Sequence, residues 1–297
     1  MDIKAKILTC LGPRLVVEPR ATILSKVVTP DYVLETILLE LNEIETVPAY
    51  FAYPPTAQVQ SCPLVLFNHS HGGDFTKGKE ELIQSSDYLQ PMSFLQTLTK
   101  EGYAVGVIDM WGFGERNKQK ESELFKEFLL KGHTLWGMRI YDNQQFLTYL
   151  LDRPEVNPEK VATMGMSMGG MMSWWLAALD ERIHVVVDIA AQVEYEALIK
   201  EKRLDRHGFY YYVPGILKQL TTNDIQQLIV PRARLCLIGR ADPLCPLVGV
   251  TDLDKRLHQS YLDQQASNQW ACEILDGGHQ ETREMRERWI QFLRQHL

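Results

Sequence analysis

The feature that most restricts the fold is a series of short apolar runs that alternate with longer helical patterns. Each run is bounded by polar or turn-forming residues. Continuous apolar runs of this length are typical of strands that are buried on both faces of a parallel sheet. The runs occupy residues 63–68, 104–109, 161–166, 185–190, 233–238 and 270–275. They predict six strands of one sheet.

The segments between these runs carry the spacing of amphipathic helices. In the last of them, Met285, Trp289, Phe292 and Leu293 form one apolar face at three- and four-residue spacing. The predicted helices cover residues 79–100, 133–151, 168–179, 250–262 and 280–297, with a weaker one at 215–229. Alternating strands and helices predict an α/β fold, a three-layer α/β/α sandwich with a mostly parallel sheet and right-handed crossovers.

Residues 32–53 mix β-branched and aromatic residues around a polar turn at Asn42 and predict an antiparallel hairpin at one edge of the sheet. We expect a single domain over residues 1–297, with residues 1–30 as an N-terminal extension. The stretches 111–132 and 192–231 are longer than usual connections in such folds. They are candidate cap-like insertions beside a substrate pocket.

Composition excludes several classes of partner. The chain has 297 residues, 45% of them hydrophobic, and a formal net charge of −7, which gives no basic field for nucleic acid. No apolar run reaches the length of a membrane span, and the N-terminus lacks the pattern of a signal peptide. Five scattered cysteines lack the spacing of a zinc site. We expect a soluble, cytoplasmic protein without metal or cofactor, and a homo-oligomer is possible.

The pattern Gly165-Met166-Ser167-Met168-Gly169 lies between a predicted strand and a predicted helix. That is the context of a nucleophile elbow, a tight turn that exposes a serine above the sheet and needs small residues two positions before and after it. The alternative is a glycine-rich turn whose serine only caps the helix. The five methionines between Met164 and Met172 are read as adaptable packing around the turn rather than thioether metal ligands.

A serine hydroxyl is a weak nucleophile, so a base and an acid must accompany it. His279 follows the last predicted strand, and Asp242 follows the strand before it, so both lie at the carboxyl edge of the sheet with Ser167. The order serine, aspartate, histidine is the one expected for this arrangement. Asp188 is a competing acid, but it lies inside an apolar run, and Asp276 is too close in sequence to His279.

The oxyanion of a tetrahedral intermediate needs backbone N–H donors. The residue after the nucleophile, Met168, is the first candidate. Ser70 or His71, in the loop after an earlier strand, supplies the second, and His71 is favoured. His69 and His71 could also suggest a metal pair, but no third ligand stands at a useful spacing.

The segments NHSHGG, GMSMGG, GRADPLCP and DGGHQE, in this order, make the chain resemble the α/β-hydrolase superfamily over residues 32–297. Further stretches resemble its dienelactone-hydrolase-like and acetyl-xylan-esterase-like bacterial branch. The resemblance implies a serine esterase in which Ser167, Asp242 and His279 form the catalytic triad. Dienelactone hydrolases carry a cysteine nucleophile where this chain has serine, and polysaccharide esterases are frequently exported. The expected substrate is therefore a small intracellular ester.

Several aromatic residues fall in segments that could overlook the site. Trp111, Tyr210 and Tyr211 are the candidate pocket walls, with Tyr212 beside them. The leading hypothesis is a hydrolase of carboxylic esters that forms an acyl-enzyme on Ser167. A peptidase or thioesterase of the same fold, and a non-catalytic ligand-binding protein, are the alternatives.

Overall fold

The structure is a computed structural model that describes residues 2–297. Nine strands form one sheet in the order β1-β2-β3-β5-β4-β6-β7-β8-β9. The pairs β1/β2, β2/β3 and β3/β5 are antiparallel, and the remaining pairs are parallel. The strands are β1 Arg20–Val28, β2 Val33–Glu40, β3 Thr46–Tyr53, β4 Cys62–Asn68, β5 Ala104–Ile108, β6 Val156–Met166, β7 Val185–Ile189, β8 Ala233–Gly239 and β9 Trp270–Leu275.

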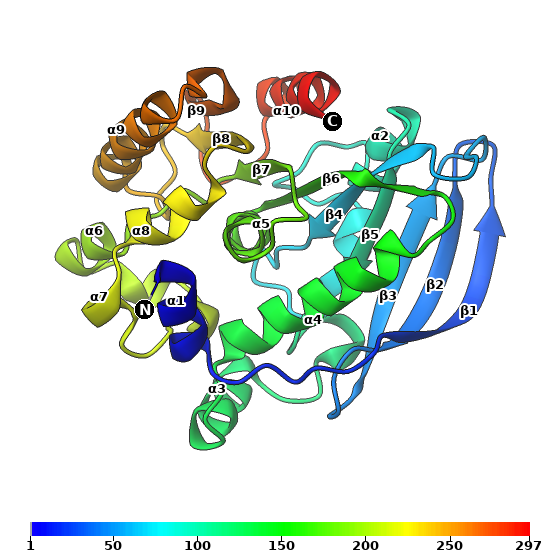
Figure 1. Ribbon diagram of the computed structural model, residues 1–297, viewed down its shortest axis with the longest axis horizontal. Helices are drawn as coiled ribbons and strands as arrows, with labels where there is room; N and C mark the ends of the chain where they lie inside the picture. The colour runs from blue at the N-terminus through cyan, green and yellow to red at the C-terminus, as the bar shows by residue number, and fades with distance from the viewer. Residues whose placement is uncertain (1) are drawn as a thin grey trace.

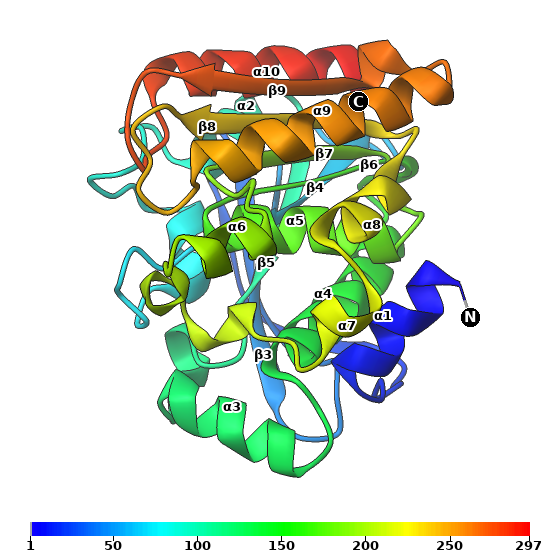
Figure 2. The ribbon, with the colours of Figure 1, turned by 90° about the vertical axis from the view of Figure 1, so that its left-hand side faces the viewer.

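Helices cover both faces of the sheet (Figures 1 and 2). On one face, α2 and α10 pack with an apolar cluster that includes Phe94, Leu98 and Trp289. On the other, α4 and α5 pack against the centre of the sheet. The helices are α1 Ile3–Leu11, α2 Phe94–Lys100, α3 Glu121–Leu130, α4 Leu135–Leu151, α5 Met168–Leu179, α6 Tyr195–Lys200, α7 Ile216–Gln219, α8 Thr222–Gln226, α9 Leu247–Asp263 and α10 Arg283–His296, with short 3-10 turns at Gly78–Leu82, Gly114–Arg116, Leu204–Arg206, Phe209–Tyr211, Gln227–Ile229 and Ser267–Gln269.

This arrangement confirms the predicted three-layer α/β/α sandwich. All six predicted strands are present, and all pair in parallel with at least one neighbour. The segments β4 to β7 are buried along most of their length, as the continuous apolar runs require. The carboxyl ends of β6, β8 and β9 therefore meet at one edge of the sheet, where loops can bring distant residues together.

The predicted hairpin forms, but it does not lie at the sheet edge. Strands β2 and β3 pair around the Asn42 turn, whose side-chain Oδ1 accepts from the amides of Ile44 and Glu45 at 2.9 Å. Residues 20–28 add β1 outside this hairpin, so β1 is the edge strand. Every residue of β1 is exposed, so its sequence lacks the apolar alternation by which a half-buried strand is recognised.

The predicted helix at residues 79–100 is wrong in its middle, because residues 83–93 are not helical. Only the 3-10 turn Gly78–Leu82 and α2 are helical there. Pro91 cannot donate a helical hydrogen bond, and Ser93 caps α2 by accepting from the amide of Gln96. The weaker prediction at 215–229 divides into α7 and α8, because Thr221 and Asp224 form a capping box that starts a new helix.

Candidate active site

Ser167 occupies a strained turn between β6 and α5. Its backbone has φ 54° and ψ −121°, a left-handed φ that a residue with a side chain rarely adopts. The turn presses against β4, since a Cβ added to Gly169 would stand 1.9 Å from the carbonyl oxygen of Asn68, and one on Gly165 would stand 2.4 Å from the same atom. Glycine is therefore required on both sides of the serine, as the elbow pattern predicts.

The structure brings Ser167, His279 and Asp242 together from three loops at the carboxyl edge of the sheet. The Nε2 atom of His279 lies 2.8 Å from Ser167 Oγ, and its Nδ1 atom lies 2.8 Å from Asp242 Oδ2. Asp242 is buried, and its second oxygen accepts from the amide of Leu244 at 2.8 Å. With Nδ1–H directed to the carboxylate, Nε2 is free to accept the serine proton. This geometry suits general-base activation of a serine hydroxyl.

Neither competing acid reaches His279. Asp188 is fully buried in β7 and forms an ion pair with Arg234 at 2.8 Å. Asp276 is almost fully exposed and contacts Arg240 instead. Each carboxylate already has a cationic partner, so only Asp242 is placed to orient the histidine.

Two backbone amides near Ser167 are available to an oxyanion. Met168 is the first residue of α5, so its N–H has no acceptor within the helix. The amide of Ser70 already donates to Glu81 Oε1 at 2.7 Å, whereas the amide of His71 forms no hydrogen bond within residues 2–297. His71 lines the cavity that contains Ser167. The Ser70 amide is therefore occupied, whereas the His71 amide is free to donate, and His71 stays the predicted second donor.

His69 and Glu81 support this loop from behind. The Nδ1 atom of His69 lies 2.9 Å from the Ser70 carbonyl oxygen, and Nε2 accepts from the amide of Met110 at 3.1 Å. Complete burial lowers the pKa of His69 to about 3, so the ring is neutral. Burial raises the pKa of the Glu81 carboxyl, which accepts from Ser70 and from the Tyr88 hydroxyl. Both ring nitrogens of His69 are occupied, which favours a structural role over a metal pair with His71.

A cavity of about 330 Å³ opens onto Ser167 and His279. Its size fits a small molecule rather than a polymer segment buried along its length. Tyr210 and Tyr211 line it, as predicted. The lining residues are Ser70, His71, Gly72, Gly73, Tyr88, Met166, Ser167, Ala190, Arg206, His207, Gly208, Tyr210, Tyr211, Leu244, Cys245 and His279.

The prediction that Trp111 lines the pocket is wrong. Its ring is buried, stacked under the guanidinium of Arg116 at 4.1 Å and packed edge-on against Phe128. Sequence proximity to the site could not show that these two neighbours turn the indole into the core. Its carbonyl oxygen has a structural role, because it accepts from Arg139 at 2.6 Å.

The two predicted cap-like stretches meet at Glu121. Its carboxylate accepts from the buried Arg139 at 3.1 Å and from the amide of Phe209 at 3.0 Å. Arg139 also lies over the Tyr210 ring. Residues of the 192–231 stretch line the cavity, whereas α3 from the 111–132 stretch supports them from behind.

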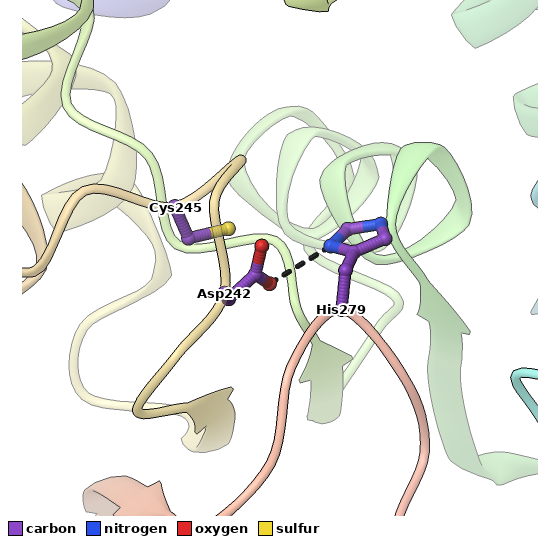
Figure 3. A group of neighbouring side chains, drawn as sticks. All are labelled: Asp242, Cys245 and His279. Carbon is purple, nitrogen blue, oxygen red and sulfur yellow. Dashed lines mark hydrogen bonds and ion pairs between the residues drawn. The ribbon is translucent and has the colours of Figure 1, made fainter.

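Asp242, Cys245 and His279 each offer one ligand atom, and these atoms lie within 4.8 Å of one another (Figure 3). A metal held there would compete with the hydrogen bond from His279 Nδ1 to Asp242. Burial, followed by the Asp242 carboxylate, raises the pKa of the Cys245 thiol well above its usual range, which disfavours the thiolate that a metal needs. The donor set fits an oriented histidine better than a resident metal.

The methionines around Ser167 are packing residues. Met164 and Met166 are buried in β6, and Met171 and Met172 are buried in α5. Met168 is also buried, and its sulfur accepts from Arg139 at 3.5 Å.

Sequence reasoning missed several cavity residues. Leu244 and Cys245 follow Asp242 on the same loop, so their proximity could have been inferred from that assignment. Tyr88 was hidden inside the wrongly predicted helix. Arg206 and His207 lie in the long stretch before Tyr210, and no local pattern distinguished them from other polar loop residues.

A larger open hollow of about 980 Å³ lies elsewhere, between α1, α4 and the end of α5. It is lined by residues such as Arg14, Tyr141 and Arg182, and none of the predicted site residues borders it. Its position gives it no part in chemistry at Ser167.

The alpha/beta hydrolase fold family matches residues 63–229, more than half of the chain. The chain belongs to the α/β-hydrolase family. It is 48% identical over 265 residues to the Bacillus subtilis (strain 168) protein named "Putative hydrolase YtaP", covering 89% of this chain and 88% of that protein. This membership confirms the resemblance seen in the four sequence motifs.

Solved structures of esterases show the same fold at low sequence identity. A glucuronoyl esterase from Solibacter usitatus superposes with a TM-score of 0.71 at 13% identity, covering 98% of this chain and 90% of that one. An acetyl xylan esterase from Paenibacillus sp. R4 gives a TM-score of 0.61 at 13% identity, covering 99% and 92%. The neighbours are thus esterases, and the likeness at this identity is one of fold.

Among residues 2–297, none of the helices combines the length and the apolar character needed to cross a bilayer.

Proposed function

We propose that this hydrolase is a serine esterase that cleaves carboxylic esters of small molecules. The observation that carries the proposal is the pair of hydrogen bonds that join Ser167 Oγ to His279 and His279 to Asp242, each 2.8 Å long. Esterase neighbours of the same fold support it. The cavity of about 330 Å³ supports a small substrate.

In the proposed mechanism, His279 takes the proton of Ser167 as Oγ attacks the ester carbonyl. The amides of Met168 and His71 donate to the oxyanion that forms. Collapse of the tetrahedral intermediate breaks the bond to the alkoxy oxygen, which leaves with the proton held by His279. A water molecule then gives a proton to His279 and attacks the acyl-enzyme. The acyl bond to Ser167 Oγ breaks, Oγ takes the proton back from His279, and the acid leaves.

Labelling with a fluorophosphonate probe tests this proposal. We expect one modified residue, Ser167, found by mass spectrometry of the digested protein. The Ser167→Ala variant should lose labelling and hydrolysis of p-nitrophenyl acetate, and His279→Ala should lose most of both. Unchanged ester hydrolysis by folded Ser167→Ala would contradict the proposal. Parallel assays with thioester and peptide substrates separate esterase activity from the thioesterase and peptidase alternatives.

A further inference from the structure

The cavity lining carries positive charge and no negative charge. The chain has 38 acidic residues against 31 lysines and arginines, yet no carboxylate is among the residues that line this cavity. The one lining side chain with a permanent charge is Arg206. An overall negative protein therefore presents a positive charge where its substrate must enter.

Arg206 has no ionic partner of its own. Within residues 2–297 its guanidinium forms no ion pair and no hydrogen bond, although it ends the 3-10 turn Leu204–Arg206 next to the cavity. Many other arginines of this protein are paired; Arg203, three positions earlier, binds Glu201 at 2.7 Å and the Pro243 carbonyl oxygen at 2.8 Å. The contacts of Arg203 tie the turn to the Asp242 loop, while the Arg206 side chain stays unpaired.

The same wall offers polar groups without partners. The Nε2 atom of His207 is buried and has no hydrogen-bond partner within the described chain. The hydroxyls of Tyr210 and Tyr211 likewise form no hydrogen bond to residues 2–297, although both side chains line the cavity. Buried polar groups are normally satisfied, so the His207 nitrogen is suited to contact a polar ligand, and the two unbonded hydroxyls of the cavity lining can contact the same ligand.

Three carboxylates lie behind the cavity wall, and each is occupied, whereas Asp205, beside Arg206 on the same turn, is exposed to solvent and does not line the cavity. Asp242 is bonded to His279, and Glu121 is bonded to Arg139. Glu81 stands behind Ser70 and Tyr88, on the wall where the oxyanion donors lie. A negative group on the substrate is thus best placed beside Arg206, on the part of the cavity that His207, Tyr210 and Tyr211 also line.

We infer that the substrate is an ester that also carries a carboxylate, which Arg206 binds while Ser167 attacks the ester carbonyl. The inference rests on the proposed esterase function. One guanidinium balances one carboxylate and can bind it in a bidentate manner, whereas a phosphate brings a charge of about −1.5 to −2 that one cation does not balance. Burial lowers the pKa of His207 to about 4 and also lowers the pKa of His71, so neither of these rings adds a second positive charge near neutral pH.

Two matched ester pairs test this inference, one for each side of the scissile bond. The acyl-side pair is 4-nitrophenyl hydrogen succinate and 4-nitrophenyl methyl succinate, followed by nitrophenol release. The alcohol-side pair is 4-acetoxybenzoate and its methyl ester, followed by acetate release. We expect wild-type protein to prefer the charged member of at least one pair, with a kcat/KM ratio that falls as salt rises above about 0.1 M.

Arg206 is exposed to solvent at the cavity rim, so in Arg206→Gln we expect the charged-to-neutral ratio of kcat/KM to fall by no more than about 10-fold, mainly through KM, as the loss of one charge-assisted contact implies. Arg206→Lys should restore part of the ratio. Lys200→Gln, which removes an exposed charge outside the cavity, should leave it unchanged. Preference for the neutral member in both pairs, or an equal effect of Arg206→Gln on both members, would overturn the inference.

Binding to a catalytically impaired protein separates this inference from the proposed function. The Kd for Ser167→Ala of the charged ester from the pair in which wild type prefers the charged member, measured by calorimetry, should rise about 10-fold when Arg206→Gln is added. If Ser167→Ala still hydrolyses esters, the proposed mechanism fails, while this comparison still decides whether Arg206 binds the carboxylate. An unchanged Kd in the double variant rejects the role of Arg206 whatever the chemistry at Ser167.

Discussion

At the residue scale, Gly169 sets the geometry of the Ser167 turn. A Cβ at this position would stand 1.9 Å from the Asn68 carbonyl oxygen, a backbone atom of β4 that cannot move without its strand. We therefore expect Gly169→Val to lose more than about 3 kcal/mol of unfolding free energy, or to shift Ser167 and lose activity. Activity per folded molecule and urea unfolding measure the two effects.

Met171→Leu is the matched control for this turn. Met171 is buried in α5, and leucine has nearly the same volume, so the change should cost less than about 1.5 kcal/mol and retain activity. A large activity loss in Met171→Leu would show that the methionines do more than fill space.

Asp242 and Asp188 have opposite expected effects. Asp242→Asn keeps the shape of the side chain but removes the charge that orients His279, so we expect kcat to fall by about 10³ to 10⁴ with little change in stability. Asp188→Asn leaves Arg234 buried without its ionic partner and should cost about 3 kcal/mol of stability, with kcat of the folded protein retained. Steady-state kinetics and urea unfolding on both variants test the assignment, which fails if Asp188→Asn is the one with impaired kcat.

Ser167, Asp242 and His279 could be placed from sequence because each follows a recognisable strand at the same edge of the sheet. The second oxyanion donor could not be chosen on that basis. What separates Ser70 from His71 is Glu81, a side chain 11 positions further on that occupies the Ser70 amide. Long-range side-chain contacts of this kind leave no local pattern in the sequence.

At the element scale, the loop that carries His279 is held between α10 and the segment before α2. Glu281 is buried and accepts from Arg286 Nε and Nη2 at 2.6 Å and from Trp289 Nε1 at 2.7 Å. The amide of Glu281 donates to the Tyr88 carbonyl oxygen at 2.8 Å. Glu281, two residues after His279, therefore ties the chain both to α10 and to the segment before α2.

Glu281→Gln tests this anchor. It leaves the mostly buried Arg286 without its anionic partner, so we expect a loss of about 3 kcal/mol of unfolding free energy and a lower kcat, because His279 is less well held. The double variant Glu281→Gln/Arg286→Met removes the unpaired charge as well and should be more stable than the single variant. Urea unfolding of both proteins provides the comparison, and equal stabilities would show that the charge of Arg286 is not the cause.

Helices and strands with one apolar face could be predicted from the sequence, and strand β1, which has none, was missed. Helix α10 shows its buried face as Met285, Trp289 and Leu293 at four-residue spacing. Strand β1 has no buried residue, and its place at the edge depends on hydrogen bonds to β2 rather than on burial. The segment 79–100 has helical spacing in places, but Pro91 and the Ser93 cap decide where α2 begins.

At the scale of the whole molecule, the neutral buried His69 couples stability to pH. Its pKa is lowered by burial from 6.5 to about 3 in the folded state. Between these values the unfolded chain binds a proton that the folded protein does not, so the free energy of unfolding falls as pH falls. Above pH 6.5 both states are neutral at this residue, and the effect disappears.

From pH 7 to pH 5, His69 alone should lower the free energy of unfolding by about 2 kcal/mol. His207, whose pKa burial lowers to about 4, acts in the same direction. Its contribution is smaller, because its side chain is partly open to solvent. Urea unfolding measured at both pH values gives the total loss.

The variant His69→Gln isolates the contribution of this one ring. Glutamine does not titrate, so the variant should lose less stability than wild type on acidification, by about 2 kcal/mol over the same interval, even if it is less stable at pH 7. If wild type and variant lose the same amount of unfolding free energy between pH 7 and pH 5, the acid sensitivity arises from other residues. Because His69 lies directly beneath the loop that carries the His71 amide, a smaller slope would mean that the acid sensitivity of the fold arises next to its proposed oxyanion site.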